Sequence, residues 1–446
     1  MNVRATSSQA VASRASTQAE TVEFLVVGAG VAGSCIADGL RRLGHEVVLV
    51  DRASGRPNRF RGEYLQPSAV QRLVRMGFGE ALLDASFPLR RLHFRDLRSP
   101  RRGVGGETWI EYPDSTEARA IQHVDLIEGL RAIAEDTLGS DMMMGTRVEA
   151  ASQGFDPDVP EVVLRSADGS TRRLRPRWIL GCDGRGSLVR RWMGGAECPP
   201  TGRVAWLGKR ELLAGALLEG ASGLPEHVEV VRTRRNGTLW TFPLGSGLQR
   251  VYWNLPAAGG PRRAEITAGL HAVLDEARPH LGCEGGRMRD VTAAPSNPAW
   301  LGPAARGRLV LAGDALAVTS PLGGQGISCA SAHVERLLQS VSDRRGAPEP
   351  FDTQSLRGYE AEARARYREV RTLNFHIYHL FYSRGPVKGL TRLVVDSWRR
   401  NPERLVRLGD LFGGTRAQPL RLREVPALMG LPTPHSRRAL TERLQA

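Results

Sequence analysis

Three glycines and one acid near the N-terminus have the types and the spacing of a dinucleotide site. Gly28, Gly30 and Gly33 follow one apolar run, and Asp51 ends the next apolar run. Glycines at these positions let the backbone turn tightly and approach a pyrophosphate, and the following helix start offers free N–H groups. An acid at the end of the second strand can accept hydrogen bonds from ribose hydroxyls. Residues 24–52 therefore predict a strand, glycine turn, helix and strand that bind a dinucleotide.

Two later strand ends carry the same combination of glycine and acid. Asp183 and Gly184 follow one apolar run, Gly313 and Asp314 follow another, and a glycine-rich turn at 323–326 then opens a helix. Such an acid can bind a ribityl or ribose hydroxyl, and such a helix start can stabilise negative charge on a ring. Three turns of this kind favour an extended cofactor across one sheet edge, which suits FAD better than NAD alone. Asp183 has a structural alternative, because it could cap the helix that follows it.

The elements that must position these turns are those of an α/β protein with a second sheet. Apolar residues recur at helical spacing over 123–138 and 264–281, and residues 203–255 alternate as strands do. We expect a Rossmann-like FAD-binding domain with an inserted, mostly antiparallel substrate sheet and a C-terminal helical region. The expected segments are a disordered tail (1–21), three parts of the FAD-binding domain (22–89, 123–195 and 296–345), two parts of the substrate sheet (90–122 and 196–295) and the helical region (346–446).

Charge, cysteine content and hydropathy bear on nucleic-acid binding, metal binding and membrane insertion. The net charge of +15 is carried by scattered arginines, since Lys209 and Lys388 are the only lysines, so nucleic-acid binding is not expected. The five cysteines are far apart and form no C-x-x-C pair, which predicts a reducing, cytoplasmic location and no metal site. No apolar run approaches the length of a membrane span. Basic segments near Trp398 and Arg404 could contact a membrane surface, although packing on the enzyme is the alternative.

Taken in order, the three glycine and acid turns resemble the fingerprints of flavoprotein monooxygenases of the para-hydroxybenzoate hydroxylase type. The squalene epoxidase branch is the most similar, on the segments Asp51-Arg52, Arg59-x-x-Gly62-Glu63-Tyr64-Leu65-Gln66-Pro67 and Ser320-Pro321-Leu322-Gly323-Gly324. The chain departs from the family at Gln122-His123, where an arginine is common, and at His333, where an aspartate is common. It also shows no membrane anchor ahead of the fold, which squalene epoxidases tend to carry.

The resemblance implies FAD as the cofactor and NAD(P)H as the electron donor. The implied activity is a monooxygenase that inserts one oxygen atom from O2 into a hydrophobic small molecule through a flavin C4a-hydroperoxide. Epoxidation or hydroxylation of a prenyl or aromatic substrate in secondary metabolism is expected. The implied FAD-binding residues are Gly28, Gly30, Val31, Ala32, Gly33, Asp51, Arg52, Arg59, Tyr64, Val148, Asp183, Gly184, Gly313, Asp314, Gly324, Gly326 and Ile327.

Side chains that act on the substrate are harder to find in the sequence. The cofactor carries most of the chemistry, so no catalytic dyad is expected, and Glu63 and Tyr64 are candidates only for ordering the site. The aromatic residues Trp240, Phe242, Tyr252 and Trp253 could line an apolar substrate pocket or simply form core. His123 and His333 have no partner at metal-ligand spacing.

Two other functions stay open. A flavin-dependent prenyl reductase of the geranylgeranyl reductase type would share the architecture, although Gly324-Gln325-Gly326 favours the monooxygenase because such reductases usually have Gly-Glu-Gly. A flavoprotein scaffold without turnover is the third hypothesis. Reduction by a separate reductase is a further alternative to direct use of NAD(P)H.

Overall fold

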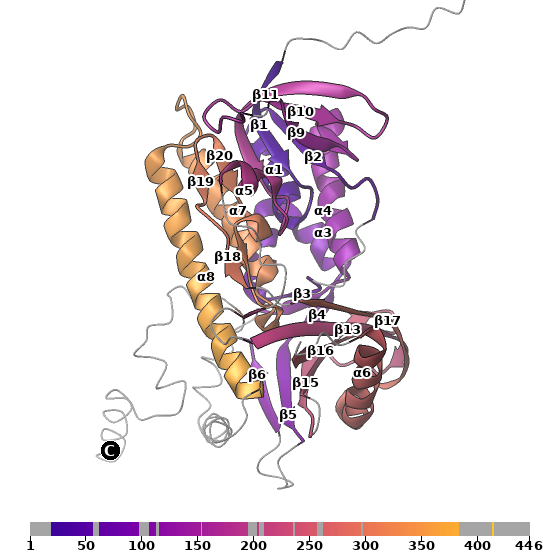
Figure 1. Cartoon of the computed structure of the whole chain (residues 1–446). Helices are drawn as coiled ribbons and strands as arrows, with labels where there is room; N and C mark the ends of the chain where they lie inside the picture. Colours follow the sequence, from indigo (N-terminus) through magenta and orange to yellow (C-terminus); the bar gives the residue numbers. More distant parts are fainter. Residues whose placement is uncertain are drawn as a thin grey trace, which may run out of the picture.

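Two eight-stranded sheets and one long helix organise the described molecule (Figure 1). The computed structural model describes residues 19–56, 62–97, 107–112, 116–152, 154–194, 203–204, 209–234, 237–256, 262–295, 298–382 and 413. The expectations for Arg59, for the tail before residue 19 and for the basic segments near Trp398 and Arg404 lie outside these residues.

The first sheet is the core of an α/β unit, because its central strands are parallel and buried on both faces. The order is β19-β20-β11-β1-β2-β8, with β9 and β10 extending from β11. Phe24, Leu25 and Val26 have no exposed surface, as expected of a strand covered on both sides. The strands are β1 (Glu20–Val27), β2 (Val47–Asp51), β8 (Met142–Met144), β9 (Arg147–Ala150), β10 (Val162–Arg165), β11 (Thr171–Gly181), β19 (Ala305–Arg306) and β20 (Leu309–Leu311).

Helices connect the strands and cover the sheets. The amphipathic pattern over 123–138 is confirmed, because α4 spans His123–Leu138 and buries Leu126, Leu130 and Ala134. A positive φ at Gly77 kinks the chain between α2 and α3. The helices are α1 (Val31–Arg42), α2 (Pro67–Leu73), α3 (Gly79–Leu83), α4 (His123–Leu138), α5 (Leu188–Trp192), α6 (Arg263–Ala277), α7 (Gly326–Asp343) and α8 (Thr353–Tyr382), with short turns η1 (Val74–Phe78), η2 (Gly139–Asp141), η3 (Arg278–His280), η4 (Gly313–Ala315) and η5 (Pro321–Gly323).

The second sheet is antiparallel except where β14 runs parallel to β5. Its order is β12-β13-β16-β15-β14-β5-β6, with β17 paired to β13. Its strands are β5 (Arg91–Asp96), β6 (Glu107–Glu111), β12 (Arg203–Val204), β13 (Lys209–Ser222), β14 (His227–Arg232), β15 (Thr238–Gly245), β16 (Leu248–Pro256) and β17 (Glu284–Pro295). Two small sheets join β3 (Tyr64–Leu65) and β4 (Phe87–Leu89) to β7 (Ala118–Ala120), and β18 (Ala299–Trp300) to β21 (Ala317–Val318).

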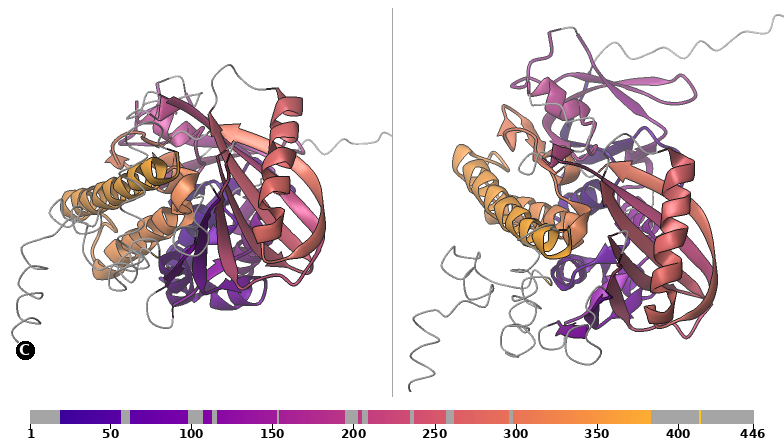
Figure 2. Two further views of the ribbon diagram at one scale, coloured as in Figure 1. Left: turned by 90° about the horizontal axis from the view of Figure 1, so that it is seen from below. Right: turned by 60° about the horizontal axis from the view of Figure 1, so that its bottom comes forward.

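The two faces of the second sheet have different neighbours. Successive side chains of a strand point to opposite faces, so Val230 of β14 joins one core and Val231 the other. We call the face that packs against Tyr64, Leu322 and α8 the inner face, and the face that packs against α6 the outer face. Figure 2 shows α6 along the outer face, with α7 and α8 on the opposite side.

Helix α8 packs against both sheets. Its Tyr359 and Ala363 belong to the core of the first sheet, and its Leu373 and Ile377 to the core on the inner face of the second. The predicted fold class, a Rossmann-like unit with an inserted, mostly antiparallel sheet followed by helix, is therefore confirmed. Within the described residues, none of the helices is both long and apolar enough to cross a membrane.

Candidate active site

The three glycine and acid turns meet at the carboxyl edge of the first sheet. Parallel pairing aligns Val27 of β1 with Gly181 of β11, and Gly181 with Leu311 of β20. Backbone hydrogen bonds continue this alignment past the strand ends, from Cys182 N to Val27 O (2.8 Å) and from Ala312 N to Gly181 O (3.0 Å). Ligands of open α/β sheets bind beyond this edge. Three segments far apart in sequence thus form one continuous rim.

The glycines of the first turn have different roles. Gly28 has φ +103°, and a Cβ there would lie 2.6 Å from the carbonyl oxygen of Cys182. A Cβ at Gly33 would lie 1.7 Å from the carbonyl oxygen of Gly28. A Cβ at Gly30 would meet no atom within 4 Å. Gly28 and Gly33 are therefore required by packing, whereas Gly30 borders open space at the start of α1, where a pyrophosphate could approach.

Asp51 is held in place by backbone donors at the end of β2. Its carboxylate accepts hydrogen bonds from Ala29 N and Ala53 N, each at 2.8 Å. Arg131 of α4 donates from Nε to Ala29 O at 2.8 Å, and its guanidinium lies 3.8 Å from Asp51. Burial lowers the pKa of Arg131, and the carboxylate of Asp51 opposes that shift. Arg131 is not predicted from the sequence, because an arginine within an amphipathic helix looks like a solvated side chain.

The second and third turns contact each other. Arg185, just after Gly184, places its Nε 3.5 Å from a carboxylate oxygen of Asp314. Asp183 accepts a hydrogen bond from Leu188 N, the first N–H of α5, at 2.5 Å, so it has the predicted structural role at the start of that helix beside the N-cap residue Ser187. Burial raises the pKa of Asp183. Of the two acids, Asp314 is the one whose side chain is substantially exposed, at 47%.

His333 of α7 binds the backbone of the third turn. Its Nδ1 accepts a hydrogen bond from Gly313 N at 3.1 Å, which requires a neutral ring protonated on the other nitrogen. Burial lowers the pKa of His333 to about 4. The departure from the aspartate common in the family therefore keeps a hydrogen-bond acceptor at this position without a charge.

Gly62 lies beside the first residues of two helices, α4 and α7. Gly62 has φ +79°, and a Cβ there would lie 3.0 Å from Nδ1 of His123 and 3.5 Å from Cδ1 of Ile327. Tyr64, two residues later, fills the space beside Gly324, where a Cβ would lie 2.6 Å from the tyrosine ring. Burial raises the pKa of Tyr64 well above its ordinary value. The segment that suggested the squalene epoxidase branch thus packs directly against the turn before α7.

Glu63 connects the α/β unit to the second sheet. Its carboxylate accepts hydrogen bonds from Arg250 and from the hydroxyl of Tyr252, each at 2.6 Å, and all three groups lie at the inner face. Burial raises the pKa of Glu63, and its two partners oppose that shift. Glu63 is 2% exposed, so its charge is stabilised by these partners rather than by water. Sequence reasoning named Glu63 and Tyr252 separately and missed Arg250, which lies 187 residues away from Glu63.

The structure brings together three of the four aromatic candidates. Trp240, Phe242 and Tyr252 lie on the inner face, where Phe242 also contacts Tyr64 with ring centroids 5.6 Å apart. Trp253 lies on the outer face against Gly269 of α6. A pocket on the inner face therefore cannot include Trp253.

The remaining candidates have simpler environments. Val31 and Ala32 begin α1, Arg52 is exposed directly after Asp51, and Val148 is buried opposite Leu164 of β10. Gly326 starts α7, and Gln325 before it accepts a hydrogen bond from Arg366 of α8 at 3.0 Å.

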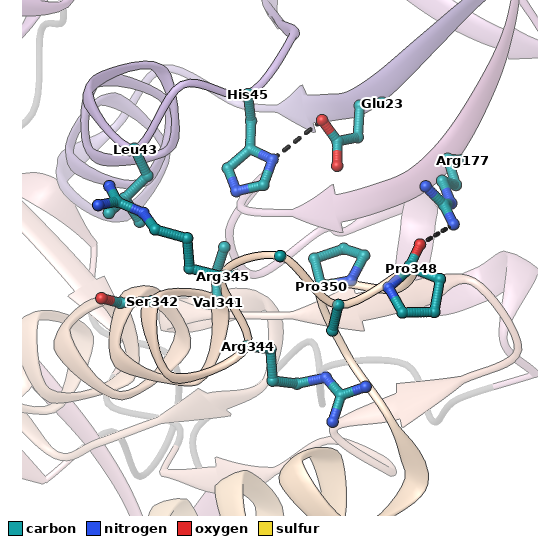
Figure 3. Close-up of a pocket in the computed structure, with 12 residues that line it drawn as sticks. Glu23, Leu43, His45, Arg177, Val341, Ser342, Arg344, Arg345, Pro348 and Pro350 are labelled. Carbon is teal, nitrogen blue, oxygen red and sulfur yellow. Dashed lines mark hydrogen bonds and ion pairs between the residues drawn. The ribbon is translucent and has the colours of Figure 1, made fainter.

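A cavity of about 100 Å³ lies at the opposite edge of the first sheet (Figure 3). It is bordered by Glu23 near the start of β1, by His45 just before β2 and by Arg345 beyond α7. These positions are at the amino ends of the strands, away from the three turns. This cavity is therefore separate from the candidate active site.

The FAD binding domain family model matches residues 21–371 of the chain. The protein belongs to this family of FAD-dependent monooxygenases and related flavoenzymes, and FAD is its cofactor. The open space at Gly30, the acids Asp51 and Asp314 and the shared rim of three strand ends fit that cofactor.

Similar proteins of known name include both reductases and monooxygenases. Menaquinone reductase of Mycobacterium tuberculosis is 28% identical over 69% of this chain and 73% of its own length. Squalene epoxidase 3 of Arabidopsis thaliana is 26% identical over 69% of this chain and 60% of its own length. The structure of p-nitrophenol 4-monooxygenase PnpA from Pseudomonas putida superposes with a TM-score of 0.73 at 19% identity, over 89% of this chain and all of that chain. The expected family is thus confirmed, and squalene epoxidases are among its relatives.

Proposed function

We propose that this protein inserts one oxygen atom from O2 into a hydrophobic small molecule, by epoxidation or hydroxylation. The observation that carries the proposal is the packing of Tyr64, beside the glycine turn before α7, on Phe242 of the inner face. A substrate on this aromatic face would lie next to a flavin bound at the carboxyl edge. Trp240, Phe242 and Tyr252 suit a prenyl chain or an aromatic ring, as in secondary metabolism.

FAD, when bound, supplies the redox chemistry and the activation of O2, with NAD(P)H as the source of electrons either directly or through a reductase. We assign its binding to backbone at the three turns and to the acids beside them. Arg131 joins this set because it contacts both Ala29 and Asp51. The proposed residues are Gly28, Gly30, Val31, Ala32, Gly33, Asp51, Arg52, Arg59, Tyr64, Arg131, Val148, Asp183, Gly184, Gly313, Asp314, Gly324, Gly326 and Ile327.

The buried group of Glu63, Arg250 and Tyr252 orders the site in this proposal. The Tyr252 hydroxyl donates a hydrogen bond to Glu63, which fixes the ring on the inner face, and Arg250 compensates the carboxylate charge. No acid or base step is assigned to Glu63 or Tyr64. Their contribution is to hold the substrate face at a fixed distance from the carboxyl edge and to exclude water.

A prenyl reductase is the second candidate, and a specific observation favours it. The menaquinone reductase of Mycobacterium tuberculosis matches this chain over 73% of its own length, whereas squalene epoxidase 3 matches it over 60% of its own length. The same aromatic inner face would suit a prenyl chain that gains two hydrogens. Gln325, rather than an acid, between Gly324 and Gly326 supports the monooxygenase.

The test is a screen of the FAD-loaded protein with NADH and NADPH against menaquinone, squalene and aromatic substrates. The proposal expects substrate-dependent O2 uptake and a product heavier by one oxygen atom. A product that gains two hydrogens without O2 would establish the reductase instead. Bound flavin that neither donor reduces, with or without an added reductase, would support the scaffold hypothesis. Sedimentation with anionic vesicles tests the proposed peripheral membrane contact.

A further inference from the structure

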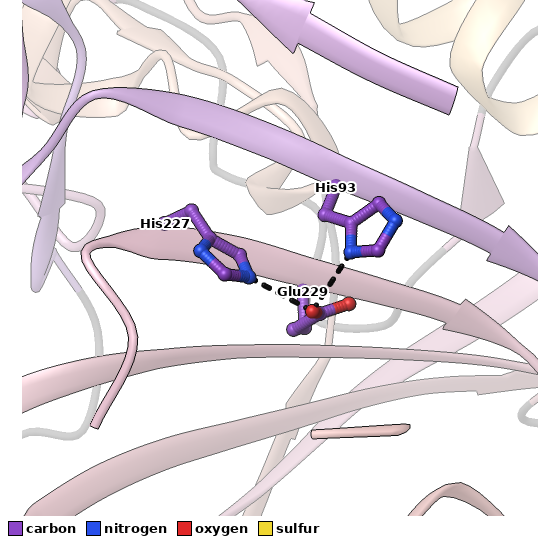
Figure 4. Close-up of side chains that lie close together, drawn as sticks. All are labelled: His93, His227 and Glu229. Carbon is purple, nitrogen blue, oxygen red and sulfur yellow. Dashed lines mark hydrogen bonds and ion pairs between the residues drawn. The ribbon is translucent and has the colours of Figure 1, made fainter. Parts of the chain in front are cut away.

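Two histidines and a glutamate form a buried cluster on the outer face of the second sheet (Figure 4). His227 and Glu229 are two residues apart on β14, so they point to the same face. His93 of β5 lies directly opposite Glu229 in the parallel pair of strands. The cluster therefore joins segments 136 residues apart, on the face that does not contact the α/β unit.

The three side chains lie close enough together to hold one metal ion. Nδ1 of His93 lies 2.9 Å and Nε2 of His227 lies 2.8 Å from the same oxygen, Oε1 of Glu229. One ligand atom from each residue lies within 4.8 Å of the others. A tetrahedral Zn²⁺ with bonds of about 2.1 Å needs ligand atoms about 3.4 Å apart. Side-chain shifts of roughly half an ångström would lengthen the two N···O distances to that spacing.

Neighbouring groups hold His93 in the orientation that a metal ligand needs. Trp109 of β6 stacks on its ring with centroids 3.7 Å apart, and the guanidinium of Arg91 lies over the Trp109 ring at 4.0 Å from its centroid. Nε2 of His93, the nitrogen away from Glu229, lies 3.8 Å from the carboxylate of Glu107. A histidine that binds a metal through one nitrogen typically donates its other N–H to a carboxylate.

With a neutral His93 and no metal, two hydrogen-bond acceptors of the cluster face each other without a proton between them. If neutral His93 donates from Nδ1 to Glu229, its Nε2 is an acceptor that faces another acceptor, Glu107. Neither Nε2 of His93 nor Oε2 of Glu229 has a hydrogen-bond partner among the described residues, and both side chains are almost fully buried. Arg95 approaches Oε2 only at 3.5 Å. A metal on Nδ1 places the proton on Nε2, which can then donate to Glu107.

We propose that His93, His227 and Glu229 bind one divalent transition-metal ion, Zn²⁺ foremost, with the fourth position left to water. Two imidazoles and a carboxylate are a ligand set that Zn²⁺ accepts. The ion links β5 to β14, which is the one parallel contact within the described part of the second sheet. Its role is to stabilise the sheet, because the outer face lies away from the flavin.

The test uses the full-length, FAD-loaded protein after removal of metal with a chelator. Zn²⁺ should bind with a stoichiometry of one by calorimetry and elemental analysis, and should raise Tm by mass action. His227→Ala should weaken binding at least about tenfold and abolish the rise in Tm. His271→Ala, at an exposed position of α6, is the matched control and should leave both unchanged.

Glu229→Gln is the second variant, because it keeps the shape of the cluster and removes the charged ligand. It should also weaken Zn²⁺ binding at least about tenfold. Wild type that binds no Zn²⁺, or that binds it as tightly as His227→Ala does, would overturn the proposal in favour of a metal-free, hydrogen-bonded cluster. Unchanged FAD content in each variant separates a lost metal from a lost fold.

Discussion

The carboxyl edge of the first sheet and the inner face of the second are built in different ways. The edge is made of backbone: Gly28, Gly33 and Gly313 allow close approach or a positive φ, and strand ends are tied by N–H to carbonyl bonds. The inner face is made of side chains, with Glu63 reaching across to Arg250 and Tyr252. A common cofactor can be bound by the first kind of surface, while the second kind can change with the substrate.

The largest difference between the two regions should appear when glycines of the edge are replaced. Gly28→Ala places a Cβ against the carbonyl of Cys182 at positive φ, so we expect a loss of about 4 kcal/mol in the free energy of unfolding and no bound FAD. Gly30→Ala should fold normally, because its Cβ would meet no protein atom within 4 Å. It should nevertheless lose FAD, because the added methyl group would occupy the space proposed for the pyrophosphate. Denaturant unfolding and flavin absorbance measure the two effects. Gly154→Ala, exposed and without close neighbours, is the control. Full FAD content in Gly30→Ala would contradict the assignment.

Acids of the edge test cofactor binding without altering the backbone. Asp314→Ala removes a side chain that is 47% exposed, so we expect a soluble protein that lacks the yellow colour of bound flavin. Asp51→Ala should do the same, at some cost in stability because Ala29 N and Ala53 N lose their acceptor. Asp136→Ala, on the exposed side of α4, should keep its FAD. An Asp314→Ala protein with full FAD content would place the third turn outside the site.

The edge should also be sensitive to acid through His333. Its folded pKa of about 4 lies below its ordinary value of 6.5, so the unfolded chain binds more protons between these values. Stability is therefore fully present above pH 6.5 and falls as the pH decreases toward 4, by about 3 kcal/mol. His333→Asn keeps an acceptor for Gly313 N and removes the titration, so urea unfolding at pH 7 and pH 4.5 should show a smaller loss in this variant. An equal loss in both proteins would exclude His333 as the cause.

The smallest effect is expected on the side-chain surface. Tyr252→Phe removes one hydrogen bond to the buried carboxylate of Glu63, which should cost about 2 kcal/mol in the free energy of unfolding and leave FAD content unchanged. Tyr367→Phe, whose ring packs on Trp300, is the control and should be nearly neutral. Loss of FAD in Tyr252→Phe would show that the two regions are not separable.

The sequence predicted the edge better than the face for a physical reason. Glycine turns at strand ends depend on residues that are close in sequence, so Gly28 to Gly33, Asp183 and Asp314 could be found from local pattern alone. Arg131 and Arg250 could not, because each acts through a contact with a segment far away in the chain. The predicted pocket grouped Tyr252 with Trp253, although successive residues of a strand point to opposite faces, and the packing of α6 identifies the face of Trp253 as the outer one. The cluster of His93, His227 and Glu229 could not be predicted from the sequence, because β5 and β14 become neighbours only in the folded sheet.

Helix α8 makes the spacing between the two regions a matter of helix length. Tyr359 donates a hydrogen bond to Leu311 O at the end of β20, and Leu373 packs on the inner face of the second sheet. Leu373 lies fourteen residues after Tyr359 in α8, a helical rise of about 21 Å, and each residue added would lengthen the helix by about 1.5 Å and turn its far end by about 100°. One inserted alanine between these anchors would therefore rotate Leu373 away from its core. The length of α8 thus contributes to the separation between the carboxyl edge of the first sheet and the inner face of the second.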